Sequence, residues 1–499
     1  MKRFSSAMLM AACLLCSAGF VSAQASQGVY SADIVVIGSG LAGHAATYAA
    51  LESGARVIWV EKNSVLGGST AIATGTFAAA GTELQKERGI QDSEQKFIDD
   101  INRIGKGKAD QSILKAFVQK ATAVWEWFVK AGLPVDTKRG PFIDPAHSPY
   151  SVPRTYVPAP NKSSQYTDLL YRQMQQYRDR LQILLSTKAE RLIVDNGRVS
   201  GVIAISSEGT LTIKAKAVIL ATGGYGSNRE MIREYSPKYS ELMTVTLPFA
   251  TGDGHRMAKA AGAQLVNMDY ICGYFGGIPS GPSKYAIGFG DLTSGAADAW
   301  KGEIWVNKRG ERFVNEDDPD EDPRETALNE QPDLESVIIF DQGMVELNKR
   351  FPIANFEKRM AENSYAIKKA DTIEELCAAF GLPVDQVKRE IVAVNGDYAA
   401  GRTDRFGKKP AAAFTGGPWY GILNRGVIFM TQGGVKTNDR LQVLDTRGQV
   451  IPGLYAAGEV QGTSQWGGYG LAGGTGNAPP LVFGMEAGRN AAAEVRMLK

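Results

Sequence analysis

Three glycines and a glutamate near the start of the chain have the types and spacing of a nucleotide site. An apolar run enters Gly38-x-Gly40-x-x-Gly43, and the next apolar segment ends at Glu61. The first glycine permits a tight turn, the second lets the backbone approach a pyrophosphate, and the third lets a helix pack on the strand. An acid at the end of the next strand accepts a hydrogen bond from a ribose hydroxyl. The pattern predicts a bound ADP moiety, with Leu41, Ala42 and Lys62 beside it.

Further glycine-bearing segments follow at long intervals, which favours FAD over a nicotinamide cofactor. An extended FAD needs contacts along its ribityl chain and ring, whereas the first segment alone would serve NAD. The residues that we expect at this cofactor are Gly67, Gly68, Ser69, Thr70, Ala221, Thr222, Gly223, Asp253, Gly458, Glu459 and Gly474.

The order of these segments resembles the fumarate reductase and 3-ketosteroid dehydrogenase superfamily of FAD oxidoreductases. Further matching segments are Thr251-Gly252-Asp253-Gly254 and Arg312-Phe313-Val314-Asn315-Glu316. The resemblance implies a FAD domain interrupted by a mobile cap, with the substrate held between them. It also implies hydride transfer between flavin N5 and a carbon next to an activating carbonyl. Members with covalent flavin carry a histidine where this chain has Ser69, so noncovalent FAD is expected.

The carboxylate anchors of the fumarate reductases are missing from this sequence. Cys272 and Tyr274 stand where the resemblance implies Gln and His, and Phe429 precedes Gly433-Gly434 where it implies His. Leu471 stands where it implies Arg. Fumarate and succinate are therefore poor candidate substrates, because a bidentate guanidinium is the usual partner of a carboxylate.

Aromatic residues take the place of these anchors and indicate a pocket for a bulky, flat substrate. The alternative is that half of them are ordinary core residues. We expect substrate contacts from Tyr274, Phe429, Gly473 and Trp466. The whole aromatic set is Tyr270, Tyr274, Phe275, Trp419, Tyr420, Phe429, Trp466 and Tyr469.

Two groups are candidates for the catalytic chemistry. Arg324, helped by Glu325, is the closest counterpart of the proton-donating arginine that the resemblance implies, although a solvated cap-loop arginine is the alternative. Tyr469 and Gly473 resemble the ketosteroid dehydrogenase loop in which a phenol and a backbone N–H polarise the substrate carbonyl. The tyrosine of that family after Asn-Glu-x-x-Pro is replaced by Asp320.

The elements that must position these residues indicate an α/β fold. We expect a discontinuous Rossmann-like FAD-binding domain with a β-meander over 181–213 and an inserted α+β cap, or clamp, domain. Helical periodicity covers 92–133, 354–364, 372–395 and 481–498. The predicted units are a signal peptide at 1–23, FAD-binding parts at 24–284 and 426–499, and the cap at 285–425.

Composition limits the partners. Lys2 and Arg3 precede an apolar run that ends near Ala23, which predicts an exported, periplasmic protein cleaved after that residue. A formal net charge of +2 without a basic stripe argues against nucleic acid. No later stretch is apolar enough for a membrane span, and 3 histidines leave no metal site to expect.

These features favour an exported FAD-dependent reductase of an α,β-unsaturated carbonyl compound. Because NAD(P)H is not available outside the cytoplasm, its electrons are expected from a separate cytochrome c or quinol-linked donor. The first alternative is a ketosteroid-type dehydrogenase that runs the same chemistry backwards. The second is a flavin-bearing electron-transfer protein without a substrate, which the large cap argues against.

Overall fold

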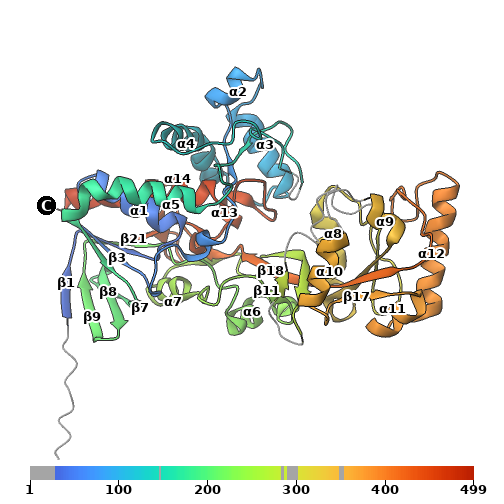
Figure 1. Ribbon diagram of the computed structural model, residues 1–499. Coiled ribbons are helices and arrows are strands. Elements are labelled where there is room, and N and C mark those ends of the chain that lie inside the picture. The colour runs from blue at the N-terminus through green and yellow to red at the C-terminus, as the bar shows by residue number, and fades with distance from the viewer. Residues whose placement is uncertain (1–27, 145–147, 282–285, 289–301, 348–352, 499) are drawn as a thin grey trace, which may run out of the picture.

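The computed structural model describes residues 28–144, 148–281, 286–288, 302–347 and 353–498. Figure 1 shows two bodies side by side, the FAD domain and the cap, with a helical layer standing on the first. The predicted signal peptide lies outside the described residues. Among the described helices none is both long and apolar enough to cross a bilayer.

The FAD domain is built on a sheet of short apolar strands. Its order is β20-β21-β10-β2-β3-β6, and the pairs from β21 to β6 are parallel. The bounds are β2 (Ile34–Ile37), β3 (Val57–Val60), β6 (Leu181–Leu184), β10 (Ala217–Leu220), β20 (Gln442–Leu444) and β21 (Val450–Ala456). Strands buried on both faces read as continuous apolar runs, and β2, β3 and β10 are buried throughout.

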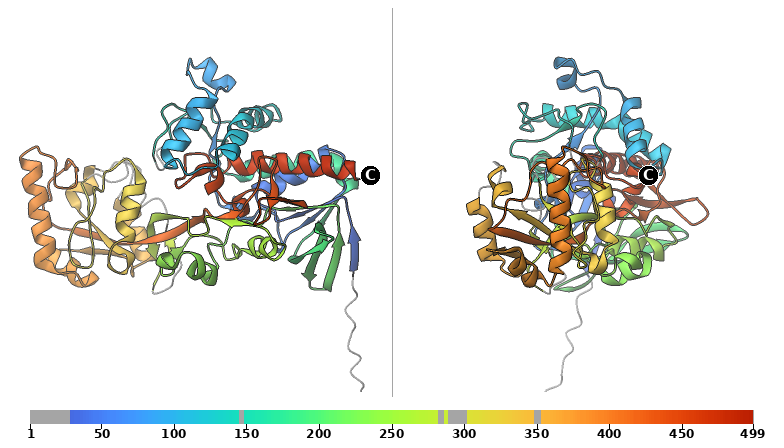
Figure 2. Two further views of the ribbon diagram at one scale, coloured as in Figure 1. Left: turned by 180° about the vertical axis from the view of Figure 1, so that it is seen from behind. Right: turned by 90° about the vertical axis from the view of Figure 1, so that its right-hand side faces the viewer.

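Different layers cover the two faces of this sheet. Ile34 and Val36 face a core with the helices, whereas Val35 and Ile37 face a core with the meander. The helices on the first face are α1 (Leu41–Glu52), α5 (Ser164–Met174) and α14 (Ala478–Met497), and Figure 2 shows α14 and α1 lying along the sheet. The meander has the order β1-β9-β8-β7. Its strands are β1 (Gly28–Ser31), β7 (Lys188–Asp195), β8 (Arg198–Ser206) and β9 (Gly209–Lys214).

The helical layer above this domain is fixed by a buried arginine. Arg154 is fully buried and pairs with Asp92 and Asp100, each at 2.8 Å. Two carboxylates and the guanidinium satisfy one another there, which a buried charge requires. The layer contains β4 (Phe77–Ala78), β5 (Thr155–Tyr156), α2 (Glu83–Glu87), α3 (Glu94–Ile104) and α4 (Gln111–Lys130).

The cap is a mostly antiparallel sheet with helices on it. The sheet order is β14-β13-β18-β16-β15, and β11 and β17 also pair with β18. Its strands are β11 (Met243–Thr244), β13 (Ile271–Pro279), β14 (Ala286–Gly288), β15 (Ile304–Val306), β16 (Glu335–Asp341), β17 (Ile367–Ala370) and β18 (Trp419–Thr431). Its helices are α8 (Glu321–Asn329), α9 (Gln342–Leu347), α10 (Ile353–Glu362), α11 (Ile373–Phe380) and α12 (Val384–Ala399).

Short elements complete the FAD side near the cap. They are α6 (Arg229–Tyr235), α7 (Asp253–Ala260), α13 (Ser464–Gly467) and the pair β12 (Leu265–Val266) with β19 (Gly434–Val435). Other short elements are the 3-10 helices η1 (Gly68–Ala71), η3 (Pro237–Tyr239) and η5 (Glu459–Gln461).

The predicted fold class, an α/β FAD-binding domain with a meander and an α+β cap, is confirmed. The cap sheet extends past the predicted limits of the cap, because β13 begins at Ile271 and β18 continues to Thr431. Residue 285, where we placed the start of the cap, lies outside the described residues. Figure 1 shows β18 running out of the cap toward the FAD domain.

Candidate functional site

The first glycine turn is shaped by close backbone packing at two of its three glycines. Gly38 has φ +99°, and a Cβ there would lie 2.3 Å from the Ala221 carbonyl oxygen. A Cβ on Gly43 would lie 2.0 Å from the Gly38 carbonyl oxygen. Neither position can carry a side chain without moving the backbone.

Gly40 differs, because the protein itself leaves room there. A Cβ on Gly40 would meet only Thr70 Oγ1, at 3.6 Å. Gly40 also caps α1 without any side-chain hydrogen bond, although Thr70 Oγ1 accepts one from the Leu41 amide at 3.0 Å. A helix N-terminus with open space above it suits a pyrophosphate, which fits the predicted role of Gly40 and of the following Ala42.

Glu61 and Lys62 tie separate cofactor segments to the first turn. Ser39 Oγ donates to Glu61 Oε2 at 2.6 Å and accepts from the Gly67 amide at 3.0 Å. Lys62 Nζ lies 2.7 Å from Asp253 Oδ2. Burial raises the pKa of the Asp253 carboxyl, but the bonds from Lys62 and Thr251 outweigh it and hold that pKa below its usual value.

The later cofactor segments contain a buried hydroxyl without a partner among the described residues and a glycine with open space beside it. Thr222 Oγ1 is buried without a hydrogen-bond partner among the described residues. Gly223 has φ +72°, and a Cβ there would meet nothing within 4 Å. Glu459 Oε1 accepts bonds from the amide and hydroxyl of Thr431, both at 2.9 Å, while burial raises the pKa of the Glu459 carboxyl. An unpaired buried hydroxyl and open glycines fit a bound FAD.

Two other predicted cofactor glycines also have a packing role in the protein. Gly458 has φ +81°, and its Cβ would lie 2.9 Å from Ala42 Cβ. Gly474 has φ +77°, and its Cβ would lie 2.7 Å from the Ala78 amide nitrogen. Gly67 and Gly68 both have positive φ, and Gly68 lies beside Gly40, with 3.6 Å from its Cβ position to the Gly40 nitrogen.

The two histidines that the structure describes, His44 and His255, are buried. Ser69 stands in the loop and is exposed. Burial lowers the pKa of His44 to about 4, and its Nδ1 donates to the Gly40 carbonyl at 3.2 Å. Burial also lowers the pKa of His255 to about 4. His147 lies outside the described residues.

On the cap side, helix α8 presents Arg324 from its first turns. Arg324 is only 2% exposed, so it is not the solvated loop arginine of the alternative interpretation. Its Nη1 donates to the Glu316 carbonyl at 3.3 Å. Asp320 caps α8 through its side chain, which accepts from the Asp322 amide at 3.1 Å. The helix cap therefore determines where the guanidinium lies.

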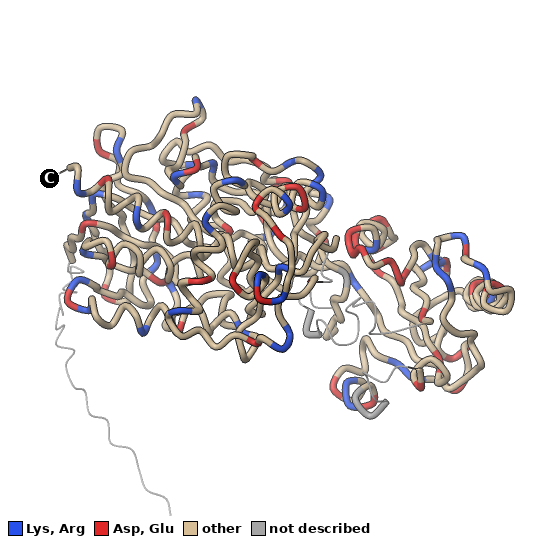
Figure 3. The backbone as a smooth tube through the Cα atoms, turned by 90° about the horizontal axis from the view of Figure 1, so that it is seen from above, with Lys and Arg blue, Asp and Glu red and all other residues tan. Residues whose placement is uncertain are grey.

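Glu325 follows Arg324 in an acidic environment. Burial raises the pKa of the Glu325 carboxyl well above its usual value, and the charges of Asp322 and Glu321 add to this rise. Burial thus favours the neutral form of this carboxyl over the ionised form. Figure 3 shows acidic residues gathered along the part of the cap nearest the FAD domain.

The predicted aromatic set divides into partly exposed residues and core residues. Tyr274 contacts Phe429 with 6.0 Å between ring centroids, and Tyr270 contacts Tyr469 at 4.8 Å. Phe429 and Tyr469 are exposed by 36% and 41%. The Tyr274 hydroxyl donates to Glu321 Oε1 at 3.1 Å, which links this ring to α8. Of these four rings, Phe429 and Tyr469 are the ones with exposed surface that a substrate could contact.

The expectation that Trp466 contacts the substrate is corrected by the structure. Trp466 is fully buried in the main core and packs on Phe483 with ring centroids 5.6 Å apart. Helix α13 turns the indole toward α14 and α4, where apolar burial is greatest. Trp419 and Tyr420 are likewise buried in the cap core. The alternative that many of these aromatics are core residues therefore holds for them.

Gly473 lies under the loop that follows the helical layer. The Tyr150 hydroxyl donates to the Gly473 carbonyl at 2.6 Å, and a Cβ on Gly473 would lie 2.4 Å from Asp144 Cβ. The same loop reaches the cap, because Ser148 Oγ donates to Asp320 Oδ2 at 2.5 Å. This loop therefore contacts both sides of the candidate site.

Sequence reasoning missed two further residues in this region. Lys106 Nζ lies 5.2 Å from the centroid of the Tyr469 ring. Burial raises the pKa of Tyr239 to about 12, and the Glu325 charge adds to the rise. The only sequence signal was the position of Lys106 between two glycines, and Tyr239 gave none.

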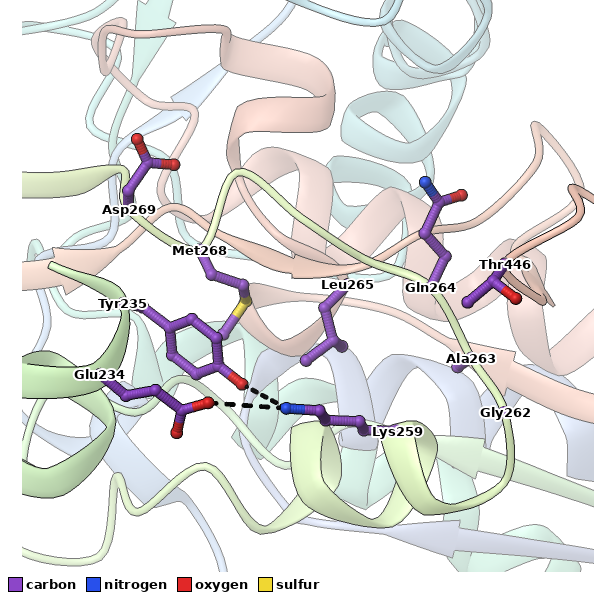
Figure 4. A pocket seen from close by; sticks show the side chains of 10 residues that line it. All are labelled: Glu234, Tyr235, Lys259, Gly262, Ala263, Gln264, Leu265, Met268, Asp269 and Thr446. Atoms are coloured by element: carbon purple, nitrogen blue, oxygen red, sulfur yellow. Dashed lines mark hydrogen bonds and ion pairs between the residues drawn. The ribbon is translucent and has the colours of Figure 1, made fainter.

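A surface pocket of about 640 Å³ is lined in part by Asp269, the residue before Tyr270 (Figure 4). Lys259 Nζ contacts the Tyr235 hydroxyl at 2.9 Å there. None of the predicted site residues lines it. Across the described part of the chain, no cluster of three or more His, Cys, Asp or Glu could hold a metal ion.

Comparison with proteins of similar sequence also indicates an FAD site. A family model described as an FAD binding domain matches residues 33–475. A urocanate reductase from Eggerthella lenta is 32% identical over 483 residues, which cover 94% of this chain and 76% of that protein. A vinyl phenol reductase from Lactiplantibacillus plantarum is 31% identical, with 86% of this chain and 89% of that protein covered.

Solved structures give the same result. The open conformation of a flavocytochrome c3 fumarate reductase superposes with a TM-score of 0.78 at 30% identity, covering 93% of this chain and 79% of that one. A 3-ketosteroid Δ1-dehydrogenase from Sterolibacterium denitrificans has the same TM-score at 21% identity, covering 93% and 100%, and so shares the fold.

The protein is an FAD-dependent oxidoreductase. It belongs to the FAD binding domain family, in the group that includes the fumarate reductases and shares its fold with the 3-ketosteroid dehydrogenases. FAD is its cofactor, and the resemblance inferred from the glycine segments is confirmed.

Proposed function

We propose that this oxidoreductase reduces the C=C bond of an α,β-unsaturated carbonyl or carboxylate compound. The observation that carries the proposal is the buried guanidinium of Arg324, held by the Glu316 carbonyl at the start of α8. The names of the reductases similar to this chain support an unsaturated substrate.

The reaction adds a hydride to one carbon of the double bond and a proton to its neighbour. Bound FAD supplies the hydride when it is reduced. Arg324 gives the proton to the carbon next to the carbonyl and recovers one from Glu325, whose carboxyl pKa is raised by burial. Tyr469 donates a hydrogen bond to the carbonyl oxygen and stabilises the negative charge that develops there.

The substrate that the cleft favours is bulky or aromatic rather than fumarate. Tyr274 and Phe429 offer ring surface where fumarate reductases are expected to hold a second carboxylate. A buried carboxylate without a partner would cost several kcal/mol. The name vinyl phenol reductase supports a ring-bearing substrate for this chain as well.

Export and a separate electron donor belong to the same proposal. The predicted signal at 1–23 would place the enzyme in the periplasm, where a cytochrome c or a quinol-linked protein would supply electrons. The similar flavocytochrome c3 fumarate reductase supports a haem partner by its name.

The test is an anaerobic assay that follows the oxidation of reduced methyl viologen. We expect an aryl acrylate to be reduced at least about 10-fold faster than fumarate at equal concentration, because one carboxylate anchor is missing. As a matched pair, Phe429→Leu should slow the aryl substrate, whereas Val392→Leu at an exposed position of the cap should not. Equal rates with fumarate and the aryl acrylate would contradict the substrate proposal.

The second candidate is a ketosteroid-type dehydrogenase, which the exposed Tyr469 favours. That activity would transfer electrons from a saturated 3-ketosteroid to an artificial acceptor such as dichlorophenolindophenol. Acceptor reduction faster than viologen-driven reduction of an aryl acrylate would favour this candidate.

A further inference from the structure

The turn after helix α3 places a lysine in a backbone conformation that suits glycine. Lys106 has φ +55°, and its neighbour Gly107 has φ +67°. Residues other than Gly, Asn and Asp seldom adopt this left-handed backbone conformation, because their Cβ approaches the carbonyl oxygen. A lysine in this left-handed conformation, beside glycines that adopt the same conformation freely, indicates that the lysine side chain has a function.

This turn is fixed to the loop that carries Tyr469. The Gly105 carbonyl accepts a bond from the Tyr469 amide at 3.0 Å. A Cβ on Gly105 would lie 2.1 Å from the Gly467 carbonyl oxygen, so the two backbones are in direct contact. Lys106 Nζ lies 5.2 Å from the Tyr469 ring centroid, within the range of a cation–π interaction.

The exposed ammonium of Lys106, like that of Lys108, has no ion pair with the described residues, whereas two other nearby cations do. Lys436 pairs with Asp110 at 2.5 Å, and Arg103 pairs with Asp100 at 3.1 Å. The charge of Lys106 reaches the cap, because it opposes the burial that raises the pKa of Glu325. Lys106 therefore contacts the Tyr469 ring, and its charge acts on a residue of the helix that carries Arg324.

We propose that Lys106 binds the carboxylate of the substrate and makes the enzyme prefer acids to neutral compounds of the same shape. The proposal rests on the proposed reductase function and adds the group that holds the activating end of the substrate. Arg324 is buried and bonded to Glu316, and the side chains of the cap around it are acidic. Lys106 is a cation on the FAD side without an ion pair among the described residues, and its ammonium lies 5.2 Å from the centroid of the Tyr469 ring.

The test compares an aryl acrylate with its primary amide in the holoenzyme. Lys106→Met should raise the KM for the acrylate about 10-fold or more, the effect of losing one charge-assisted contact. The KM for the amide should change less than about 2-fold, and kcat for both should stay within about 3-fold. Lys106→Arg should restore most of the preference, and Lys108→Met, which removes an exposed lysine two residues away, should leave it unchanged.

A binding measurement separates this inference from the reductase proposal. The saturated acid, an aryl propionate, can be titrated against the oxidised flavin absorbance without turnover. Its Kd should rise about 10-fold in Lys106→Met and increase with salt in the wild type only. If the wild type reduces no acrylate, the reductase proposal fails, yet this binding difference would still support the role of Lys106. Equal losses for acid and amide, or equal losses in Lys106→Met and Lys108→Met, would overturn it.

Discussion

The hydroxyl of Ser148 donates to Oδ2 of Asp320 at 2.5 Å, and this bond joins the FAD side of the molecule to the first turn of α8. Asp320 also caps the helix that carries Arg324. One carboxylate thus serves both the helix and the contact between domains. Any change at Asp320 should therefore affect the position of Arg324.

The two roles of Asp320 can be separated by urea unfolding. Asp320→Ala should lower the free energy of unfolding by about 1 kcal/mol more than Asp320→Asn, because Asn remains a good N-cap. In a double-mutant cycle, Ser148→Ala and Asp320→Ala should couple by about 0.5 kcal/mol or more. Additive losses would show that the Ser148 contact contributes nothing.

Two glycines of the first turn should respond differently to alanine. Gly38→Ala forces a Cβ to 2.3 Å from the Ala221 carbonyl oxygen, so both folding and flavin content should fall. Gly40→Ala meets only Thr70 Oγ1 at 3.6 Å, so the protein should fold but lose FAD. Flavin absorbance per chain, together with the melting temperature, checks this. Full flavin content in Gly40→Ala would contradict the predicted pyrophosphate position.

The FAD should leave the protein on acid precipitation. Ser69 stands where a covalent family member is expected to have a histidine, and the described histidines are buried elsewhere. The supernatant should be yellow, and the denatured chain should show no added mass. A mass increment equal to FAD would disprove noncovalent binding.

The proton path can be assigned with two variants. If Arg324 donates the proton, Arg324→Ala should lower turnover at least ~10²-fold, with flavin content and viologen-driven flavin reduction unchanged. If Tyr469 provides most of the carbonyl polarisation, Tyr469→Phe should cost ~10²-fold. Arg405→Ala, at an exposed arginine of the cap, is the control. Wild-type rates in both test variants would show that the catalytic groups lie elsewhere.

Glu303 should make the stability of the protein depend on pH. Burial, followed by the charges of Asp317 and Glu316 and opposed by Lys408, raises the pKa of its carboxyl to about 8. The unfolded chain has the ordinary value of about 4.3, so its carboxylate ionises first as the pH rises. The stabilisation is therefore fully present below about pH 4.3 and is lost as the pH rises to about 8.

Glu303→Gln removes this titrating carboxyl. The midpoint of urea unfolding should therefore fall less between pH 5 and 8 in the variant than in the wild type. The bond from Lys408 Nζ goes to the Glu303 carbonyl and should survive the substitution. An identical pH slope in the wild type and the variant would show that Glu303 ionises normally.

The parts of the fold that follow local rules could be predicted from the sequence. The runs at 34–37, 57–60 and 217–220 are apolar throughout and became buried parallel strands, and Gly38 after the first run forms the expected turn. The meander alternates apolar and polar residues, as a half-buried sheet must. These signals involve neighbours along the chain.

The candidate site could be predicted less well, because its contacts join distant segments. Trp466 and Tyr469 are three residues apart and both aromatic, yet one is fully buried and the other 41% exposed. That difference depends on how α13 packs, which local composition does not encode. The contact of Lys106 with Tyr469 spans more than three hundred residues, and Ser148 with Asp320 spans 172.

Strand β18 connects the cap to the FAD domain and determines how stiff that connection is. It is continuous from Trp419 in the cap to Thr431, whose amide and hydroxyl bind Glu459 in the cofactor groove. Paired strands resist torsion more than a single chain does, so we expect the cap to bend rather than swing. The register of β13 against β18 shifts at Cys272/Gly273 and at Tyr274/Gly277, and we expect bending to occur at these two points. We expect bending of the cap to displace Thr431 at the end of β18. Strain in the cap would then be transmitted to the flavin along this strand.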